Sequence, residues 1–220
     1  YILWYDNNQD VVKVSIPQML CPSDGLGGKT IRAADGNELA RNNYFGVFSG
    51  MKEGNLSFPG NPTPLPQTQR AVFDCNHPTT VAQIRDGTSN TMCIAESLTG
   101  PEGYYRGNFW SDQAPGALIF TQLAPNSRLP DICHPDPQWC LNLPELNLPS
   151  SPGNNVWGQA DDHTAAARSR HPGGVQVLMV DGSVQWINEQ IDSHPVGDPL
   201  YPGAWQALAT IDGGEAPPTY

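Results

Sequence analysis

The sequence predicts an α+β protein that is mainly antiparallel β, with many loops rich in proline and glycine and little helix. Glycine and proline number 22 each among the 220 residues, which is typical of short strands joined by many ordered turns. Charged residues make up only 15% of the chain, so helices with charged outer faces are not expected to dominate. The length suits one domain with its own core, so residues 1–220 are predicted to form a single domain.

The first half of the chain contains three predicted strands. Residues 11–20 alternate well enough for a first strand, and Pro17 places that strand at an edge or a bulge. Residues 43–48 form a short aromatic strand. A turn at Asp86-Gly87 precedes the next strand, at 91–95. These strands supply part of the expected sheet.

Residues from about 123 to 153 differ in composition from the rest of the chain. Their many prolines exclude helix. Cys133 and Cys140 flank a short part of this segment, where a disulfide would act as a local staple. We expect an inserted, ordered loop region that either packs over the sheet or faces a ligand or partner. Residues 164–168, which follow it, could form one helical turn.

The clearest local pattern is a β-hairpin over residues 171–187. His171 opens a Pro-Gly-Gly turn, an apolar run follows, and Asp181-Gly182 separates that run from a second one. Asp-Gly between apolar runs is a strong hairpin signal, because both central residues of a type I′ turn need positive φ. The sequence therefore predicts two antiparallel strands joined by a type I′ turn at Asp181-Gly182.

Five segments, taken together and in order, carry a resemblance to a known family. They are an apolar run followed by C-P-S-D at 16–24, N-Y-F-G at 43–46, D-G-T-S-N-T…E within 84–96, His171 with nine residues before Asp181-Gly182, and L-A-T-I-D-G-G-E within 207–215. This set resembles the H-X9-DG family of bacterial type IV pilin-like and type II secretion pseudopilin-like proteins. The family motif residues, to which we assign structural roles, are His171, Asp181, Gly182, Asp86, Gly87, Asn90, Glu96 and Cys21.

The resemblance implies a pilin-like globular sheet domain and a non-enzymatic, exported subunit of a filament or of a cell-surface or secretion assembly. The implied partners are homologous pilin-like subunits or cell-surface components. The apolar amino-terminal helix of the family is absent, so the chain looks like a fragment that would reach a membrane only through that missing helix. Such a fragment is expected to be extracytoplasmic and monomeric or weakly associated.

The charge balance narrows the range of partners. Eleven Lys and Arg residues against 22 Asp and Glu residues give a net charge of −11. An acidic surface repels phosphate backbones and anionic lipids, so we expect no nucleic-acid partner. It suits an extracellular protein or one that binds divalent cations, although it can also serve solubility alone.

The five cysteines do not form paired C-x2-C motifs of a structural zinc site. Cys133 and Cys140 are one candidate disulfide. Cys93 lies in an apolar strand where the resembled family usually has an aliphatic residue, which implies a buried free thiol. Cys21 and Cys75 then remain as a possible second disulfide. Disulfides would agree with an oxidising location, whereas five reduced thiols would indicate the cytosol.

Common catalytic motifs do not occur in the sequence, including G-x-S-x-G, H-E-x-x-H, the Walker loop and G-x-G-x-x-G. His171 and Asp181 could act as base and acid for Ser89 or Ser169. However, His171 and Asp181 lie at opposite ends of one predicted strand, about 30 Å apart. A triad that uses both residues is therefore not expected.

Calcium is the most specific cofactor hypothesis, because hard cations bind several carboxylate and carbonyl oxygens from loops. Four aspartates offer such oxygens: Asp86, Asp161, Asp162 and Asp181. The alternative, which we favour, is that Asp86 and Asp181 are turn residues that bond to their own backbone.

Glu96 ends a predicted strand and His171 precedes another. Each polar group lies next to apolar residues, so the two could meet as a buried acid–histidine pair that fixes the register of the sheet. We favour this structural role for His171 over a ligand role.

Aromatic residues near the predicted loops could form a platform for glycans: Trp110, Trp139, Trp157, Tyr104 and Tyr105. A protein with little helix also uses such side chains to fill its core. Two alternative functions follow, namely a surface binding module for glycan or another extracellular polymer, and a metal-dependent hydrolase on the same scaffold. Exposed aromatic rings would favour the first, and a cleft with clustered carboxylates and histidine the second.

Overall fold

A computed structural model of the chain describes residues 8–25, 30–32, 36–49, 51–52, 65, 69–75, 77–111, 114–136, 138–153, 163–194 and 203–214. Its elements, in chain order, are α1 (Gln9–Val12), the 3-10 turn η2 (Pro17–Met19), β1 (Thr30–Arg32), β2 (Glu38–Ala40), β3 (Tyr44–Val47), the 3-10 turn η5 (Val81–Gln83), β4 (Met92–Glu96), β5 (Leu118–Ile119), β6 (Asp131–Cys133), the 3-10 turn η6 (Pro144–Leu146), β7 (Ser150–Pro152), β8 (Gly174–Met179), β9 (Val184–Asn188) and α2 (Ala204–Ala207).

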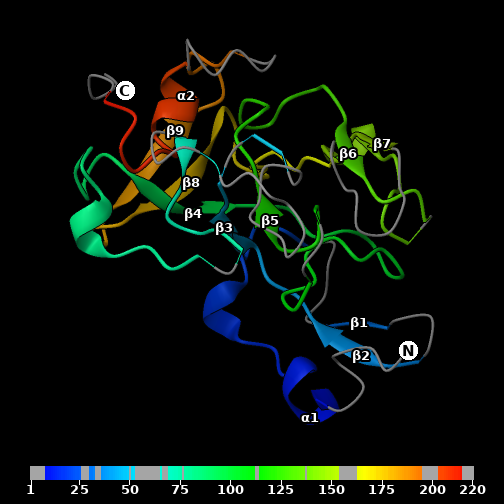
Figure 1. Cartoon of the computed structure of the whole chain (residues 1–220). Helices are drawn as coiled ribbons and strands as arrows, with labels where there is room; N and C mark the ends of the chain where they lie inside the picture. The colour runs from blue at the N-terminus through cyan, green and yellow to red at the C-terminus, as the bar shows by residue number, and fades with distance from the viewer. Residues whose placement is uncertain are drawn as a thin grey trace.

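A five-stranded sheet with the order β5-β3-β4-β8-β9 forms the centre of the fold. Its pairs β3/β4, β4/β8 and β8/β9 are antiparallel, and only β3/β5 is parallel. The hairpin β1/β2 and the parallel pair β6/β7 lie to the sides of this sheet (Figure 1). The predicted mainly antiparallel β class with little helix is confirmed.

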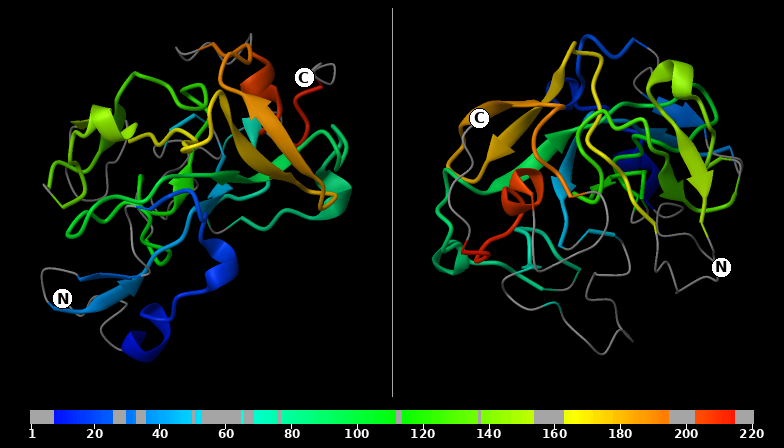
Figure 2. Two further views of the ribbon diagram at one scale, coloured as in Figure 1. Left: turned by 180° about the vertical axis from the view of Figure 1, so that it is seen from behind. Right: turned by 90° about the horizontal axis from the view of Figure 1, so that it is seen from above.

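One face of the sheet, the inner face, carries the main core. Val175, Val177 and Met179 alternate along β8 and are buried there, as the period of two in a strand requires. The short helix α2 lies beside the sheet (Figure 2). It packs against this face through Trp205, whose side chain is fully buried and whose indole N–H donates to the Leu123 carbonyl. The inner face is therefore closed by the carboxyl-terminal segment.

The opposite face, the outer face, is only partly covered. Residues paired across antiparallel strands share a face, so one row on this side runs from Tyr44 and Glu96 to Gln176 and Trp186. A second row contains Ile94, Leu178 and Val184. The first row ends beside His171, because the loop before β8 returns to this side of the sheet.

The β8/β9 hairpin is present at the predicted place, but its turn differs from the prediction. Only Gly182 has positive φ, at 89°, and the Gly182 N–H donates to the Met179 carbonyl. Asp181 keeps negative φ and instead accepts hydrogen bonds from the N–H and hydroxyl of Ser183. The predicted type I′ turn is therefore wrong, and the connection is a longer loop in which Gly182 alone adopts the left-handed conformation.

The predicted strand over residues 11–20 is also wrong. The chain forms α1 and the 3-10 turn η2 there. Pro17 opens η2, where its fixed φ suits the first position of a helical turn and its missing N–H costs nothing. Val12 is buried while Val11 and Val14 are exposed, so the apparent alternation does not correspond to one buried face.

Several contacts hold the segment at 123–153 in place, and one of them was predicted from the sequence. The predicted Cys133–Cys140 disulfide is present. The short strands β6 and β7 were not expected, and Leu148, just before β7, packs against Leu98 and Tyr104. The described part of this segment thus packs into the structure.

Residues 164–168 do not form the helical turn considered from the sequence. The chain forms neither helix nor strand there and is buried, and its backbone bonds to other segments. The Thr164 N–H donates to the Ile132 carbonyl, and the Ala166 N–H donates to the carboxylate of Asp131. These tertiary hydrogen bonds outweigh the local helix propensity of the alanine run.

Asp131 and two arginines form a buried ion cluster at this junction. Arg106 lies 2.7 Å and Arg168 2.9 Å from the Asp131 carboxylate, and all three side chains are fully buried. Burial alone would raise the pKa of Asp131, but Arg168 and Arg106 together outweigh it and lower that pKa. The cluster ties β6 to the two segments that carry the arginines.

Neither α1 nor α2 exceeds four residues, and no helix in the described ranges is long and apolar enough to span a bilayer.

Candidate functional site

Three segments far apart in the sequence bring a thiol, a carboxylate and an imidazole together at the end of the outer face. Cys21 follows the 3-10 turn η2, and Glu96 is the last residue of β4. His171 precedes β8, behind a turn in which Gly173 has φ of 86°. The strand ends and the turn before β8 therefore fix the positions of all three side chains.

The reactive atoms converge on one point. His171 Nε2 lies 3.1 Å from Glu96 Oε1 and 3.6 Å from Cys21 Sγ. The ligand atoms of all three residues lie within 4.8 Å of one another. Ser23 Oγ completes the group at 3.0 Å from Cys21 Sγ and 3.4 Å from His171 Nε2.

Glu96 and His171 form the acid–histidine pair that their positions at strand ends predict. Glu96 is 1% exposed, whereas the His171 side chain is 34% exposed. The second carboxylate oxygen of Glu96 accepts the backbone N–H of Gln176 on β8. The carboxylate thus has one fixed backbone contact and one oxygen directed at the imidazole.

Asn43 holds the Cys21 segment against the sheet. Its side-chain oxygen accepts the Cys21 N–H at 2.9 Å, and its amide donates to the Ser97 carbonyl and to Asp24. Asp24 in turn accepts the N–H and hydroxyl of Thr99. This network explains why the C-P-S-D and N-Y-F-G segments lie side by side.

Two aromatic residues border the cluster. Burial, followed by the nearby Cys21 and Glu96, raises the pKa of Tyr44 to about 12, so Tyr44 stays protonated at neutral pH. On the other side the ring of Trp186, which is 40% exposed, lies edge-on to His171 with centroids 6.2 Å apart. The cluster therefore lies between a neutral phenol and a partly exposed indole.

The geometry does not match a nucleophile–base–acid relay. Such a relay uses one imidazole nitrogen for the nucleophile and the other for the orienting acid. Here Nε2 of His171 faces both the thiol and the carboxylate. Nitrogen, oxygen and sulfur atoms that converge in this way are instead the donor set of a metal site.

The four aspartates of the calcium hypothesis are not brought together in the described part of the chain. Asp86 accepts the N–H groups of Gly213 and Gly214 and so anchors the carboxyl-terminal segment. Asp181 bonds to Ser183 within its own loop, and these hydrogen bonds lower the pKa of Asp181. Asp161 and Asp162 lie outside the described residues. Asp181 thus acts as the turn residue that we favoured, whereas the Asp86 carboxylate makes tertiary hydrogen bonds instead of bonding to its own turn.

The predicted Cys21–Cys75 disulfide is wrong, because both residues are free thiols. Cys21 Sγ faces Ser23 and His171, whereas Cys75 packs against a different cluster that contains Phe120. Cys93 is also a free thiol, and it is half-buried rather than fully buried.

The proposed aromatic platform is not exposed as a surface. Tyr104 is fully buried and Tyr105 is 8% exposed. Trp139 is edge-on to Tyr105, with ring centroids 4.7 Å apart, and Trp110 packs against the same apolar cluster. Trp157 lies outside the described residues. Tyr104 and Tyr105 therefore fill the interior, as the alternative explanation expected, whereas Trp110 and Trp139 are half-buried against that interior.

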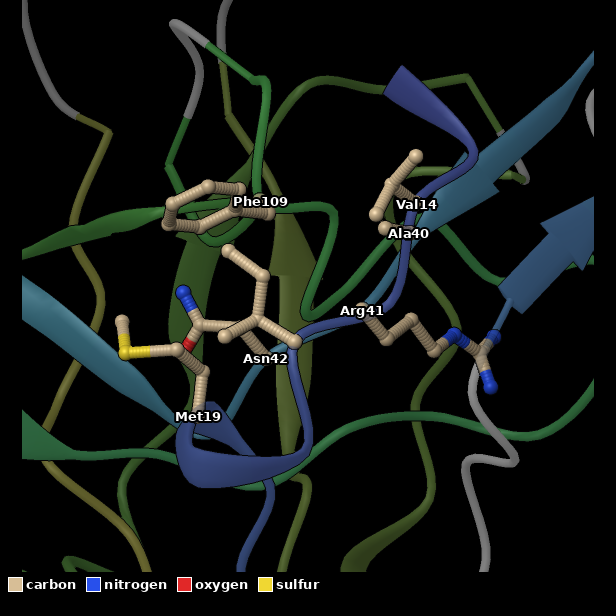
Figure 3. Close-up of a pocket in the computed structure, with 7 residues that line it drawn as sticks. Val14, Met19, Ala40, Arg41, Asn42 and Phe109 are labelled. Carbon is tan, nitrogen blue, oxygen red and sulfur yellow. The ribbon is translucent and has the colours of Figure 1, made fainter. Parts of the chain in front are cut away.

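A shallow depression lies elsewhere, between the amino-terminal segment and Phe109 (Figure 3). Val14, Met19 and Ala40 contribute to its lining, while the guanidinium of Arg41 is turned away from Met19 and Phe109 and donates to the carbonyls of Pro101 and Tyr104. The depression has essentially no room for a water-sized molecule. It is packing between segments rather than a ligand site.

Sequence reasoning found the Glu96–His171 pair but placed Cys21 in a disulfide. The family motifs could have indicated that Cys21 joins this pair. Three of these motifs each place one metal-ligand type of side chain, namely Cys21, Glu96 or His171, next to a predicted strand. Nothing local in the sequence shows that these segments meet, because Cys21 and His171 are 150 residues apart.

Comparison with known proteins gives one match. A family model described as "Protein of unknown function (DUF1559)", with the short name SBP_bac_10, matches residues 3–194. No curated protein and no solved structure matches the chain.

Proposed function

Because the chain belongs to the DUF1559 family, we propose that it is a globular domain of an exported, pilin-like subunit that works by assembly rather than by catalysis. Three features support this proposal. They are the five sequence segments that resemble pilin-like proteins, the fold built around one sheet, and the exposed apolar side chains on strand β9 and the adjoining outer face. The partners would be homologous pilin-like subunits or cell-surface components.

The observation that carries the proposal is the open edge of the sheet at β9. In the part of the chain that the structure describes, this strand pairs with β8 on one side and with no strand on the other. Val184 is 66% exposed and Trp186 40% exposed on it. An edge strand with free backbone groups and exposed apolar side chains can pair with a strand of another subunit.

The outer face next to this edge supports the same proposal. Ile94 and Leu178 are only half-buried, and they lie in register with Val184. They extend the apolar surface inward from the edge, on the side away from α2. A second subunit that docks at β9 would cover this row and gain apolar burial as well as strand pairing.

The Cys133–Cys140 disulfide supports an extracytoplasmic location, since such bonds persist in oxidising compartments. The net charge of −11 agrees with it, because acidic surfaces stay soluble and avoid nucleic acids.

The test is sedimentation of the purified chain over a wide range of concentrations. We expect weak self-association, and we expect Val184→Lys to raise its dissociation constant at least about tenfold, because a charge would be buried at the edge. Val81→Lys is the matched control, since Val81 is 70% exposed on the turn η5, which is not a strand of the sheet. A wild-type chain that is monomeric throughout, or equal effects of both substitutions, would contradict the proposal.

A further inference from the structure

We propose that Cys21, Glu96 and His171 form a binding site for a divalent transition metal ion, and that zinc is the ion their geometry fits best. The site lies at the end of the outer face, beside His171, and its metal binding does not depend on the assembly role proposed for β9.

The distances between the donor atoms agree with a tetrahedral site. Zn–S bonds of about 2.3 Å and Zn–N or Zn–O bonds of about 2.0–2.1 Å place sulfur and nitrogen about 3.6 Å apart, and nitrogen and oxygen about 3.3 Å apart. Cys21 Sγ lies 3.6 Å from His171 Nε2, and Glu96 Oε1 lies 3.1 Å from it. Two of the three donor–donor distances therefore match a tetrahedral site, and the third, between Cys21 Sγ and the Glu96 carboxylate, is within 4.8 Å.

The charges also balance. A thiolate and a carboxylate carry two negative charges, which a divalent ion neutralises while the imidazole stays neutral. Glu96 is 1% exposed and Cys21 6% exposed, and a buried charge is costly unless it is paired. Among the described residues, His171 is the only basic side chain within ion-pair distance of Glu96, so a bound cation would supply a permanent counter-charge.

The fourth position faces solvent. His171 is partly exposed and Ser23 is exposed. The hydroxyl of Ser23 lies close to both Cys21 Sγ and His171 Nε2, where it can hydrogen-bond to a metal-bound water. An ion can thus enter from the outer face without opening the core.

The surrounding hydrogen bonds hold the ligand side chains in position, as the outer partners of metal ligands commonly do. The Gln176 N–H fixes the Glu96 carboxylate, and Asn43 fixes the backbone of Cys21. A sulfur donor favours zinc and other softer ions over calcium and magnesium, which prefer all-oxygen sites. The chemistry of this cluster therefore differs from that of the calcium hypothesis.

The test is a calorimetric zinc titration of the purified chain, treated first with a chelator and kept under argon so that the thiols stay reduced and the disulfide stays closed. We expect one zinc ion per chain. Cys21→Ser and His171→Ala should each lower the affinity about 100-fold or more, because each removes a direct ligand. Cys75→Ser and Cys93→Ser are the matched controls, as they remove the other free thiols, and they should leave the affinity unchanged.

A second readout uses the unaltered chain and so avoids the question of whether a variant folds. Zinc should slow the alkylation of Cys21 at least about tenfold, measured by mass spectrometry of peptides, with no such effect at Cys75 or Cys93. The proposal is overturned if the wild-type chain takes up no zinc, if the control substitutions weaken binding as much as Cys21→Ser does, or if zinc leaves the alkylation of Cys21 unchanged.

Discussion

Glu96 and Asp131 are both buried carboxylates, with relative exposures of 1% and 0%, yet they have different partners. Asp131 is neutralised by Arg106 and Arg168 and also accepts the Ala166 N–H. Glu96 has one backbone donor and a half-exposed histidine, with the thiol of Cys21 beside it.

The difference separates a structural charge from a candidate ligand. Both oxygens of Asp131 are held by fixed guanidinium and amide donors within the interior, so no position is left for another molecule. One oxygen of Glu96 points toward two other ligand-type atoms at the edge of solvent. Burial alone therefore does not reveal function; the chemical type of the partners and access from solvent do.

The largest expected effect is that of Asp131→Asn. It leaves two buried arginines without their counter-charge, which typically costs about 3–5 kcal/mol of unfolding free energy. Denaturant unfolding monitored by tryptophan fluorescence measures this loss. Asp10→Asn is the control, because Asp10 forms only an exposed ion pair with Lys13, and it should change stability little. A loss for Asp131→Asn as small as for Asp10→Asn would contradict the assigned role.

The same cluster predicts how stability depends on pH. The arginines lower the pKa of Asp131 in the folded chain below its unfolded value of about 3.9. The stabilisation is therefore complete above the unfolded pKa and is lost as the pH falls through the folded-state value. The unfolding midpoint of the wild-type chain should decline below about pH 4. Asp131→Asn should make this decline shallower. If the unfolding midpoint of the variant falls at acid pH as steeply as that of the wild type, Asp131 does not have the role given to it here.

Glu96→Gln should cost less, about 1–2 kcal/mol in the metal-free chain, because the amide can still accept the Gln176 N–H. Its larger effect concerns zinc. An ion at 100 times its dissociation constant adds about 2.7 kcal/mol to the wild-type stability, and Glu96→Gln should remove most of that gain. Thermal unfolding with and without zinc measures both the loss in the metal-free chain and the stabilisation by zinc. If Glu96→Gln keeps the full stabilisation by zinc, Glu96 is not a ligand.

The smallest effect is expected for Asp86→Asn, about 1 kcal/mol, through weaker hydrogen bonds to Gly213 and Gly214. Zinc affinity should stay at the wild-type value, because this carboxylate lies outside the cluster of ligand atoms. Calcium should not raise the unfolding temperature of either chain. A calcium-dependent rise that Asp86→Asn abolishes would restore the aspartate hypothesis.

The sequence predicted those features that depend on neighbouring residues. The β8/β9 hairpin follows from two apolar runs around Asp181-Gly182, and the Cys133–Cys140 disulfide closes a short segment. Glu96 and His171 could be paired because each lies at the end of a recognisable strand. The mainly antiparallel β fold class was predicted from the high glycine and proline content and the low fraction of charged residues.

Features set by contacts distant in the sequence were missed or wrong. Residues 164–168 form no helical turn, because the Thr164 N–H donates to the Ile132 carbonyl and the Ala166 N–H donates to the Asp131 carboxylate. Residues 11–20 alternate in polarity without pairing as a strand. Cys21 reaches the site only because the Asn43 amide joins it to the sheet, which no local pattern shows.

The proposed zinc site brings together the Cys21 thiol, the Glu96 carboxylate and the His171 imidazole beside the outer face of the sheet. X-ray absorption at the zinc edge of the zinc-loaded chain tests it most directly. We expect the spectrum to show one sulfur ligand at about 2.3 Å and nitrogen or oxygen ligands at about 2.0–2.1 Å, and we expect the sulfur ligand to be lost in Cys21→Ser. A first shell of nitrogen and oxygen alone in the wild-type chain would contradict it.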